Sequence, residues 1–125
     1  MVAKPLSPGD IVVIQMPQHL PRGTEQEGQR PALVVGIPQV LGDPRFPLVL
    51  VVPLTTDRHQ TWSQLSPELY PTLSAGTAGL TADSVVLFDQ LRAVSIARIT
   101  SYLGTLPSDV YASIQGAIKR MLGSP

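Results

Sequence analysis

Thirteen prolines and ten glycines are spread along the 125 residues of this chain and are not concentrated in any one part of it. Proline fixes its own φ and removes a backbone donor, while glycine favours turns, so both interrupt regular structure. A chain interrupted this often is divided into many short segments joined by turns. We therefore expect a β-rich fold.

The composition fits one folded domain over residues 1–125. Hydrophobic residues make up 43% of the chain, which is too many for a disordered segment. There are no cysteines, which suits a reducing cytoplasm, and the longest apolar stretch, residues 47–54, is too short to span a bilayer. We expect a cytoplasmic protein with no membrane contact. The nine basic and nine acidic residues balance, so any nucleic-acid binding must use a local cluster of cations.

Short runs of apolar and β-branched residues predict the strands. We expect them over residues 11–16, 32–36, 48–54, 84–91 and 99–103, with a weak strand at 68–73. Residues 48–54 are apolar almost throughout, which is typical of a strand covered on both faces, so we place that strand at the centre of the sheet. Residues 17–29 form a long loop, and unstructured loops of this length are often functional.

The C-terminal segment predicts the one clear helix. Its start signals are Pro107, Ser108 and Asp109, and Gly123 is expected just beyond its end. Between these points, apolar residues recur at helical spacing and form one stripe, at Val110, Ile114, Ile118 and Met121. We expect this stripe to pack on the sheet.

The stretch of residues 23–35 joins a polar, glycine-containing loop to a buried strand. Arg30 lies at the junction and precedes Pro31, which biases Arg30 toward an extended conformation. A guanidinium held there offers a planar fork of donors suited to a phosphate. The alternative is an ordinary surface ion pair with Glu25 or Glu27 in the same loop.

The end of the central strand supplies further donors. Thr55 closes that strand, and its hydroxyl either holds a phosphate oxygen in a transition state or only satisfies the strand end. Thr56, Arg58 and His59 follow on the same rim. A histidine can serve as a general base, although one in a polar turn is more often simply solvated. His59 and His19 are the only histidines, so with no cysteine and no ligand spacing we predict no metal site.

Residues 89–92 read Asp-Gln-Leu-Arg and overlap the predicted strand at 84–91. Alternation along a strand would put Gln90 and Arg92 on one face, with donors suited to bases and phosphates. The alternative is an ordinary polar edge after a buried run. The sequence has no serine nucleophile motif, no phosphate-binding glycine loop and no pair of catalytic carboxylates.

Four segments follow one another in a fixed order: G-D-I-V-V (9–13), G-T-E-Q-E-G-Q-R-P-A-L-V-V (23–35), V-V-P-L-T-T (51–56) and S-V-V-L-F-D-Q-L-R (84–92). Together with a closing strand and a C-terminal helix, they resemble the MazF/PemK family of toxin endoribonucleases. The G-T-E-Q-E-G-Q-R-P segment is the most specific part. The resemblance covers most of the chain and implies an α+β, mostly β fold: a small SH3-like barrel of the CcdB/PemK type with a C-terminal α-helix.

The resemblance also implies a function. The family cleaves single-stranded RNA at short sequences without a metal or other cofactor, usually as a homodimer, and a cognate antitoxin blocks its groove. Arg30 and Thr55 match the family's catalytic positions. The ribose 2′-OH would attack the adjacent phosphate and leave a 2′,3′-cyclic phosphate and a 5′-OH, with Arg30 stabilising the phosphorane and Thr55 holding a phosphate oxygen. The implied RNA-contacting residues are Glu25, Gln26, Thr56, Arg58, His59, Gln90 and Arg92.

A second hypothesis is a non-catalytic binding module on the same fold. It would be either a CcdB-like toxin directed at DNA gyrase or a catalytically silent relative. A gyrase poison of that type is expected to present recognition residues at its C-terminal end. Residues 121–125 contain no aromatic residue, which argues against this alternative.

Overall fold

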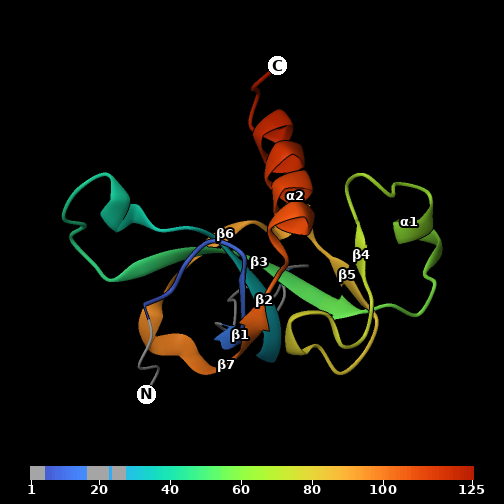
Figure 1. The fold of residues 1–125 in the computed structure, drawn as a ribbon, viewed down its shortest axis with the longest axis horizontal. Coiled ribbons are helices and arrows are strands. Elements are labelled where there is room, and N and C mark those ends of the chain that lie inside the picture. Colours follow the sequence, from blue (N-terminus) through green and yellow to red (C-terminus); the bar gives the residue numbers. More distant parts are fainter. Residues whose placement is uncertain (1–4, 17–22, 24–27) are drawn as a thin grey trace.

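The computed structural model describes residues 5–16, 23 and 28–125. In that part, the chain forms a curled antiparallel sheet of seven strands with a C-terminal helix on one face (Figure 1). The strands are β1 (Asp10–Met16), β2 (Gly28–Gly36), β3 (Leu48–Thr56), β4 (Thr72–Leu73), β5 (Ser84–Val86), β6 (Arg92–Ser95) and β7 (Ile99–Thr105). The α-helices are α1 (Thr61–Gln64) and α2 (Ser108–Met121), and short 3-10 turns are η1 (Pro38–Val40), η2 (Thr77–Gly79), η3 (Phe88–Gln90) and η4 (Ile96–Arg98). The predicted mostly β architecture with a C-terminal helix is confirmed.

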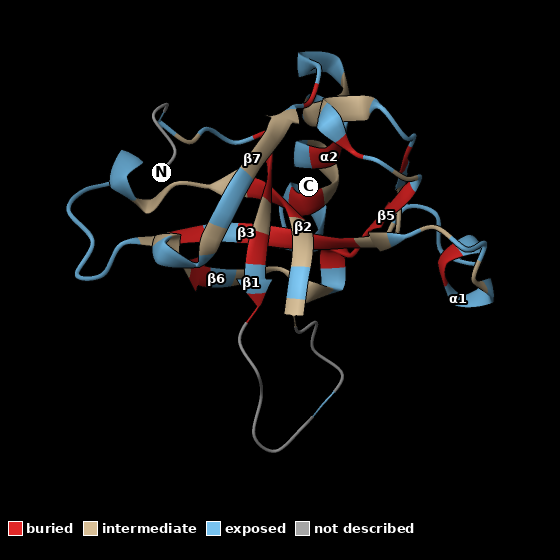
Figure 2. Ribbon diagram, turned by 90° about the horizontal axis from the view of Figure 1, so that it is seen from below, coloured by how far each residue is buried: buried red, intermediate tan, exposed pale blue. Residues whose placement is uncertain are grey.

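Strand β3 is the centre of the sheet, as its apolar sequence predicts. It pairs with β2 along one edge and with β5 and β6 along the other, in the order β4-β5-β3-β2-β1-β7 with β6 beside β3. Val51, Val52 and Leu54 of β3 are completely buried. Figure 2 shows buried residues along the inner strands and exposed residues over most of the connections.

Alternation along the strands divides the core between the two faces of the sheet. On the face covered by α2, which we call the helix face, the core contains Ile11, Leu33, Val52, Leu54, Phe88, Ile114 and Ile118. On the other face, which curls inward and which we call the barrel face, it contains Val12, Ile14, Met16, Ala32, Val34, Val49, Val51 and Val94. Segment η4 and the start of β7 contribute Ile96 and Ile99 to the edge of this second core. The core on the barrel face therefore consists of apolar side chains that are almost completely buried.

The stripe of helix α2 packs on the sheet over only part of its predicted length. Ile114 and Ile118 are buried in the helix-face core, and Val110 is half-buried against it. Met121 is 41% exposed, so its inclusion in the stripe is wrong. The last turn of the helix extends beyond the sheet. The spacing of apolar residues along a helix cannot show where the sheet it packs on ends.

The sequence predicted the C-terminal end of α2 correctly but not its N-cap. Pro107 is the N-cap and has no side chain capping the helix, so Ser108 and Asp109 lie inside the first turn instead of at the cap. Gly123 ends the helix in the left-handed region at φ 101°, as expected of a residue at that position. Its N–H donates to the carbonyl of Arg120 at 3.0 Å, which satisfies one of the free carbonyls of the last turn.

The predicted strand at 84–91 is wrong in its second half, because a proline on the neighbouring strand interrupts the pairing. The N–H of Leu87 donates to the carbonyl of Pro53 at 3.0 Å, but Pro53 has no N–H to donate in return. The carbonyl of Leu87 accepts from the N–H of Gln90 at 2.9 Å instead, which closes the turn η3. This turn places Phe88 in the helix-face core, where it is only 2% exposed.

Other boundaries also differ from the prediction. Strand β2 begins at Gly28, four residues earlier than expected, and β7 continues past Gly104 to Thr105. The predicted weak strand at 68–73 is reduced to β4, and the short helix α1 was not predicted. None of the helices in the described ranges is long and apolar enough to cross a membrane.

Candidate active site

Arg30 and Thr55 lie on the neighbouring strands β2 and β3, near the same end of the sheet. Arg30 is paired with Ile14 of β1. On its other side, the β2–β3 register pairs Ala32 with Pro53, and extending that antiparallel register by two residues sets Arg30 against Thr55. Both residues are part of strands: Arg30 lies inside β2, which begins before the predicted strand at 32–36, and Thr55 lies in β3, which continues to Thr56.

The two side chains leave the sheet on the same face. Arg30 alternates with Ala32, which belongs to the barrel-face core, and Thr55 alternates with Val51 of the same core. Arg30 and Thr55 are half-buried, whereas their neighbours Ala32 and Val51 are completely buried. A guanidinium and a hydroxyl thus lie on one face of the sheet, at the margin of an apolar core. Electrostatic interactions with an anion are stronger beside such a low-dielectric wall than in water.

Local sequence explains why Arg30 is held in extended backbone. Pro31 follows it and disfavours the helical region for Arg30. Gly28 begins the strand at φ 82°, a conformation that favours glycine. Arg30 also interacts with another group of the chain. Glu25 and Gln26 of the preceding loop, and His19, lie outside the described residues.

Gln90 and Arg92 do not share a strand face, so that expectation is wrong. Gln90 is in the turn η3, whereas Arg92 begins β6 and pairs with Val51. Because Val51 faces the barrel interior, Arg92 is on the same face as Arg30 and Thr55. Val51 precedes Thr55 by four residues, or about 13 Å along a strand, so Arg92 lies further inside the same face.

Thr56, Arg58 and His59 belong to the exposed end of β3 and the turn after it. Thr56 alternates to the opposite face from Thr55. His59 adopts φ 56°, and its N–H donates to Oδ1 of Asp57 at 2.9 Å. The imidazole is 78% exposed and its Nδ1 lies 4.0 Å from Oδ1 of Asp57. The turn thus presents Arg58 and His59 to solvent beyond the Arg30–Thr55 pair, not beside it.

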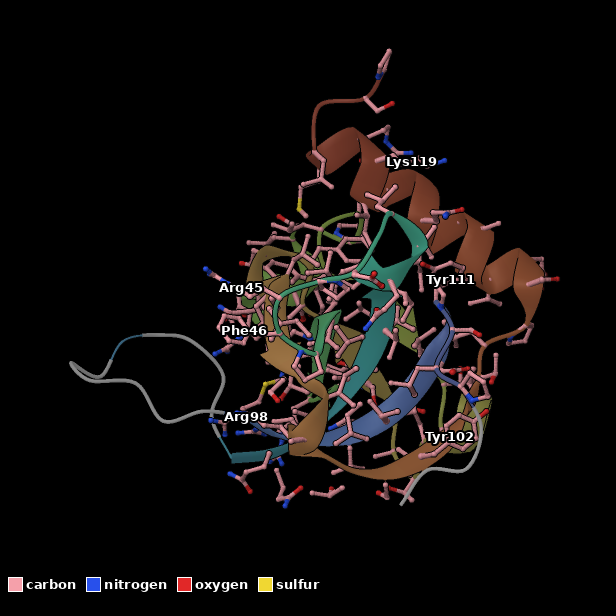
Figure 3. All side chains as sticks on the ribbon, turned by 90° about the vertical axis from the view of Figure 1, so that its left-hand side faces the viewer. Arg45, Phe46, Arg98, Tyr102, Tyr111 and Lys119 are labelled. Carbon is pink, nitrogen blue, oxygen red and sulfur yellow. The ribbon has the colours of Figure 1, made fainter. Side chains whose placement is uncertain are left out.

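Arg98 is a cation near this end of the sheet that sequence analysis did not select. It precedes β7, whose Ile99 pairs with Ile14, the residue that also pairs with Arg30. Its Nη1 lies 3.5 Å from the carbonyl of Gln15, and Figure 3 shows it beside the end of β1. The only signal in the sequence was a basic residue just before the last strand.

Within residues 5–16, 23 and 28–125, no group of three or more His, Cys, Asp or Glu side chains could hold a metal ion. The described part of the site contains hydrogen-bond donors: the Thr55 hydroxyl and the guanidinium groups of Arg30 and Arg98 near one end of the sheet, with Arg92 further along the barrel face. Such an arrangement suits an anion with several oxygens, of which a phosphodiester is the commonest biological example.

Comparison with known proteins places the chain in a family. Residues 7–122 match the family described as the PemK-like, MazF-like toxin of type II toxin–antitoxin systems. Among solved structures, MazF from Deinococcus radiodurans is 27% identical, with 95% of this chain and 96% of that chain covered and a TM-score of 0.66. An endoribonuclease in complex with its cognate antitoxin from a mycobacterial species is 20% identical, with 99% and 98% covered and a TM-score of 0.63.

The toxin MazF-mt6 of Mycobacterium tuberculosis shares the same fold at 19% identity, with 93% of this chain and 98% of that chain covered and a TM-score of 0.64. The family match includes all strands and the whole of helix α2 in the described part of the chain. The protein therefore belongs to the family of PemK-like, MazF-like toxins of type II toxin–antitoxin systems.

Proposed function

We propose that this toxin is a sequence-specific, metal-independent endoribonuclease that cleaves single-stranded RNA. The observation that carries the proposal is the placement of Arg30 and Thr55 on one face of adjacent strands, at the mouth of the barrel. Single-stranded RNA is the form whose bases are accessible for recognition, and its 2′-OH is an internal nucleophile. Family membership supports the same activity, since a mycobacterial structure of this fold is described as an endoribonuclease.

In the proposed reaction, the ribose 2′-oxygen forms a bond to the adjacent phosphorus and the bond from phosphorus to the 5′-oxygen breaks. The 2′-OH loses its proton, the leaving 5′-oxygen gains one, and the products carry a 2′,3′-cyclic phosphate and a 5′-OH. Negative charge grows on the phosphorane oxygens in the transition state. The Arg30 guanidinium would stabilise that charge and take part in proton transfer, and the Thr55 hydroxyl would donate to a phosphate oxygen.

The remaining parts of the proposal concern RNA contacts and partners. Arg92 on the barrel face and the exposed Thr56, Arg58 and His59 would bind the strand on either side of the cleaved phosphate, together with Gln90 and the loop residues Glu25 and Gln26. We also infer a cytoplasmic homodimer regulated by a cognate antitoxin. The outer strand β7 leaves one edge of the sheet without a partner strand in the described part of the chain, and such edges are usually covered.

Incubation of the purified protein with a long RNA in EDTA tests the proposal. We expect cleavage by the wild type and a loss of about 10²–10³-fold in rate for Arg30→Ala and for Thr55→Val, the usual effect of removing one transition-state donor. Arg45→Ala is the matched control, because Arg45 lies on an exposed loop against the ring of Phe46. Absence of cleavage by the wild type, or undiminished cleavage by Arg30→Ala, would refute it. A gyrase supercoiling assay on the same samples tests the non-catalytic alternative.

A further inference from the structure

A hollow of about 520 Å³ opens beside the end of β3, outside the Arg30–Thr55 pair. Its volume lies in the range of about 300–1,000 Å³ that is usual for small-ligand sites. The segment of residues 57–72, which contains α1, forms its wall and lies at the opposite end of the molecule from the loop 37–47 (Figure 1). The residues that line it include Asp57, His59, Gln64, Tyr70 and Thr72.

Strand register connects this hollow to the proposed site of cleavage. Val85 of β5 pairs with Thr55 on one side and with Thr72 on the other, so these three residues form one row across the sheet on the same face. Two strand spacings, or about 10 Å, separate Thr72 from Thr55. The N–H of Asp57 donates to the carbonyl of Asp83 at 2.8 Å, which continues the β3–β5 pairing and turns the Asp57 side chain to the face of Thr55.

The hollow has an aromatic wall that is held in place before any ligand binds. The hydroxyl of Tyr70 donates to Oδ2 of Asp89 at 2.6 Å. The ring of Tyr70 meets the ring of Trp62 edge to face, with the centroids 4.9 Å apart and the planes at 80°. Trp62 is 47% exposed and Tyr70 is half-buried, so part of this aromatic surface faces solvent. Fixed, partly exposed rings of this kind are the surfaces on which unpaired bases stack.

The polar groups of the hollow determine which hydrogen-bonding groups a bound base must carry. One oxygen of Asp57 accepts from the N–H of His59, and the other makes no hydrogen bond to the described residues. The side-chain amide of Gln64 makes no hydrogen bond to those residues either. A carboxylate accepts and cannot donate, so it favours a base that carries an amino group. Guanine, adenine and cytosine carry one. Uracil offers only its ring N3–H, which lies between two carbonyl oxygens that a carboxylate repels.

We propose that this hollow binds one unpaired base flanking the cleaved phosphodiester and selects an amino-bearing base over uracil. Tyr70 supplies the stacking surface, and Asp57 and Gln64 read the base edge. The proposal rests on the proposed endoribonuclease function, and it adds a determinant of the cleavage sequence on the 57–72 segment.

Cleavage of a randomised RNA library, with the ends mapped by sequencing, tests the selection. We expect the wild type to show one flanking position depleted of uracil by about tenfold or more. Asp57→Asn keeps an acceptor for the N–H of His59 and adds a donor, so uracil should become accepted at that position. Asp43→Asn makes the same chemical change on a distant exposed turn and should leave the preference unchanged. An unaltered preference in Asp57→Asn would overturn the proposal.

Oligonucleotide binding tests the aromatic wall without requiring cleavage. Tyr70→Leu should weaken binding of an amino-base oligonucleotide by about 10–100-fold, whereas Tyr70→Phe should stay within a few fold because the ring remains. Gln64→Ala should weaken it less than Tyr70→Leu, and Gln115→Ala, on the exposed face of α2, should not weaken it. If the wild type cleaves no RNA, the proposed function fails, and this binding series still decides about the hollow. Equal binding by all variants, or no discrimination against uracil, overturns the inference.

Discussion

Strand β7 passes so close to the turn η2 that one glycine there should not tolerate a methyl group. A Cβ added at Gly104 would lie 2.7 Å from both the carbonyl carbon and the oxygen of Ala78. These are backbone atoms, and Ala78 already has φ 49°, so the turn cannot easily give way. Gly104→Ala must therefore displace η2 or β7, and overpacking of this kind costs about 1–3 kcal/mol of unfolding free energy.

Gly116→Ala is the matched control, with the opposite expected sign. A Cβ at Gly116 has only Nη1 of Arg120 nearby, at 3.9 Å, which is an ordinary contact. Replacing a glycine inside a helix by alanine stabilises it by about 0.8–1.0 kcal/mol. For 125 residues, the entropy of unfolding near 60 °C is about 260 cal/mol/K. Each kcal/mol of unfolding free energy therefore shifts Tm by about 4 °C. Gly104→Ala should lower Tm by about 4–12 °C, and Gly116→Ala should raise it by about 3–4 °C.

Thermal unfolding followed by circular dichroism, at one fixed protomer concentration, measures both shifts. The concentration must be fixed because an oligomer's Tm depends on it. A Tm for Gly104→Ala within about 2 °C of the wild type would show that β7 and η2 are not in the close contact described. Equal destabilisation by both substitutions would show that the effect belongs to glycine replacement in general and not to this contact.

Four further substitutions test the core, a buried polar contact and a titrating group. Ile114→Ala should destabilise by about 2–5 kcal/mol in urea unfolding, whereas Met121→Ala should change stability by less than about 0.5 kcal/mol, and equal effects would contradict the shortened stripe. Asp10 is buried, and its carboxylate accepts hydrogen bonds from the N–H of Ser7 at 2.8 Å and from the hydroxyl of Thr105 at 2.7 Å. Asp10→Ala should therefore cost about 1–3 kcal/mol, and a neutral result would contradict those bonds. The hydrogen bond to Asp89 raises the pKa of Tyr70 above its usual value of 10.0. The folded state then holds this proton more tightly than the unfolded state, so the stabilisation is present below pH 10 and is lost as the pH rises further. Tyr70→Phe should flatten that alkaline decline in a pH series of unfolding curves, and an identical decline would refute the assignment.

Much of the candidate site could be proposed from short-range patterns. Arg30 before Pro31 and Thr55 after a run of apolar residues are visible in the sequence, and their order matches the family motif. Their common face was not predictable, because it depends on the register between β2 and β3. Arg98 was also missed, because its contact with Gln15 joins residues far apart in the sequence. The hollow beside Asp57 was missed although residues 57–72 line it, because a hollow depends on how that segment folds back on itself. Pairing across a sheet leaves no signature in either strand alone.

The sequence by itself determined the elements whose causes are local. Strands at 11–16 and 48–54 follow from β-branched, apolar runs, and helix α2 follows from its periodicity and from Gly123 at its end. Tertiary structure decided the features that depend on contact with another segment of the chain. Pro53 ends the pairing of β5 from the neighbouring strand, and the edge of the sheet leaves Met121 exposed. The reason is physical: backbone propensity acts over a few residues, whereas hydrogen-bond partners and buried surface are supplied by whichever distant segment folds alongside.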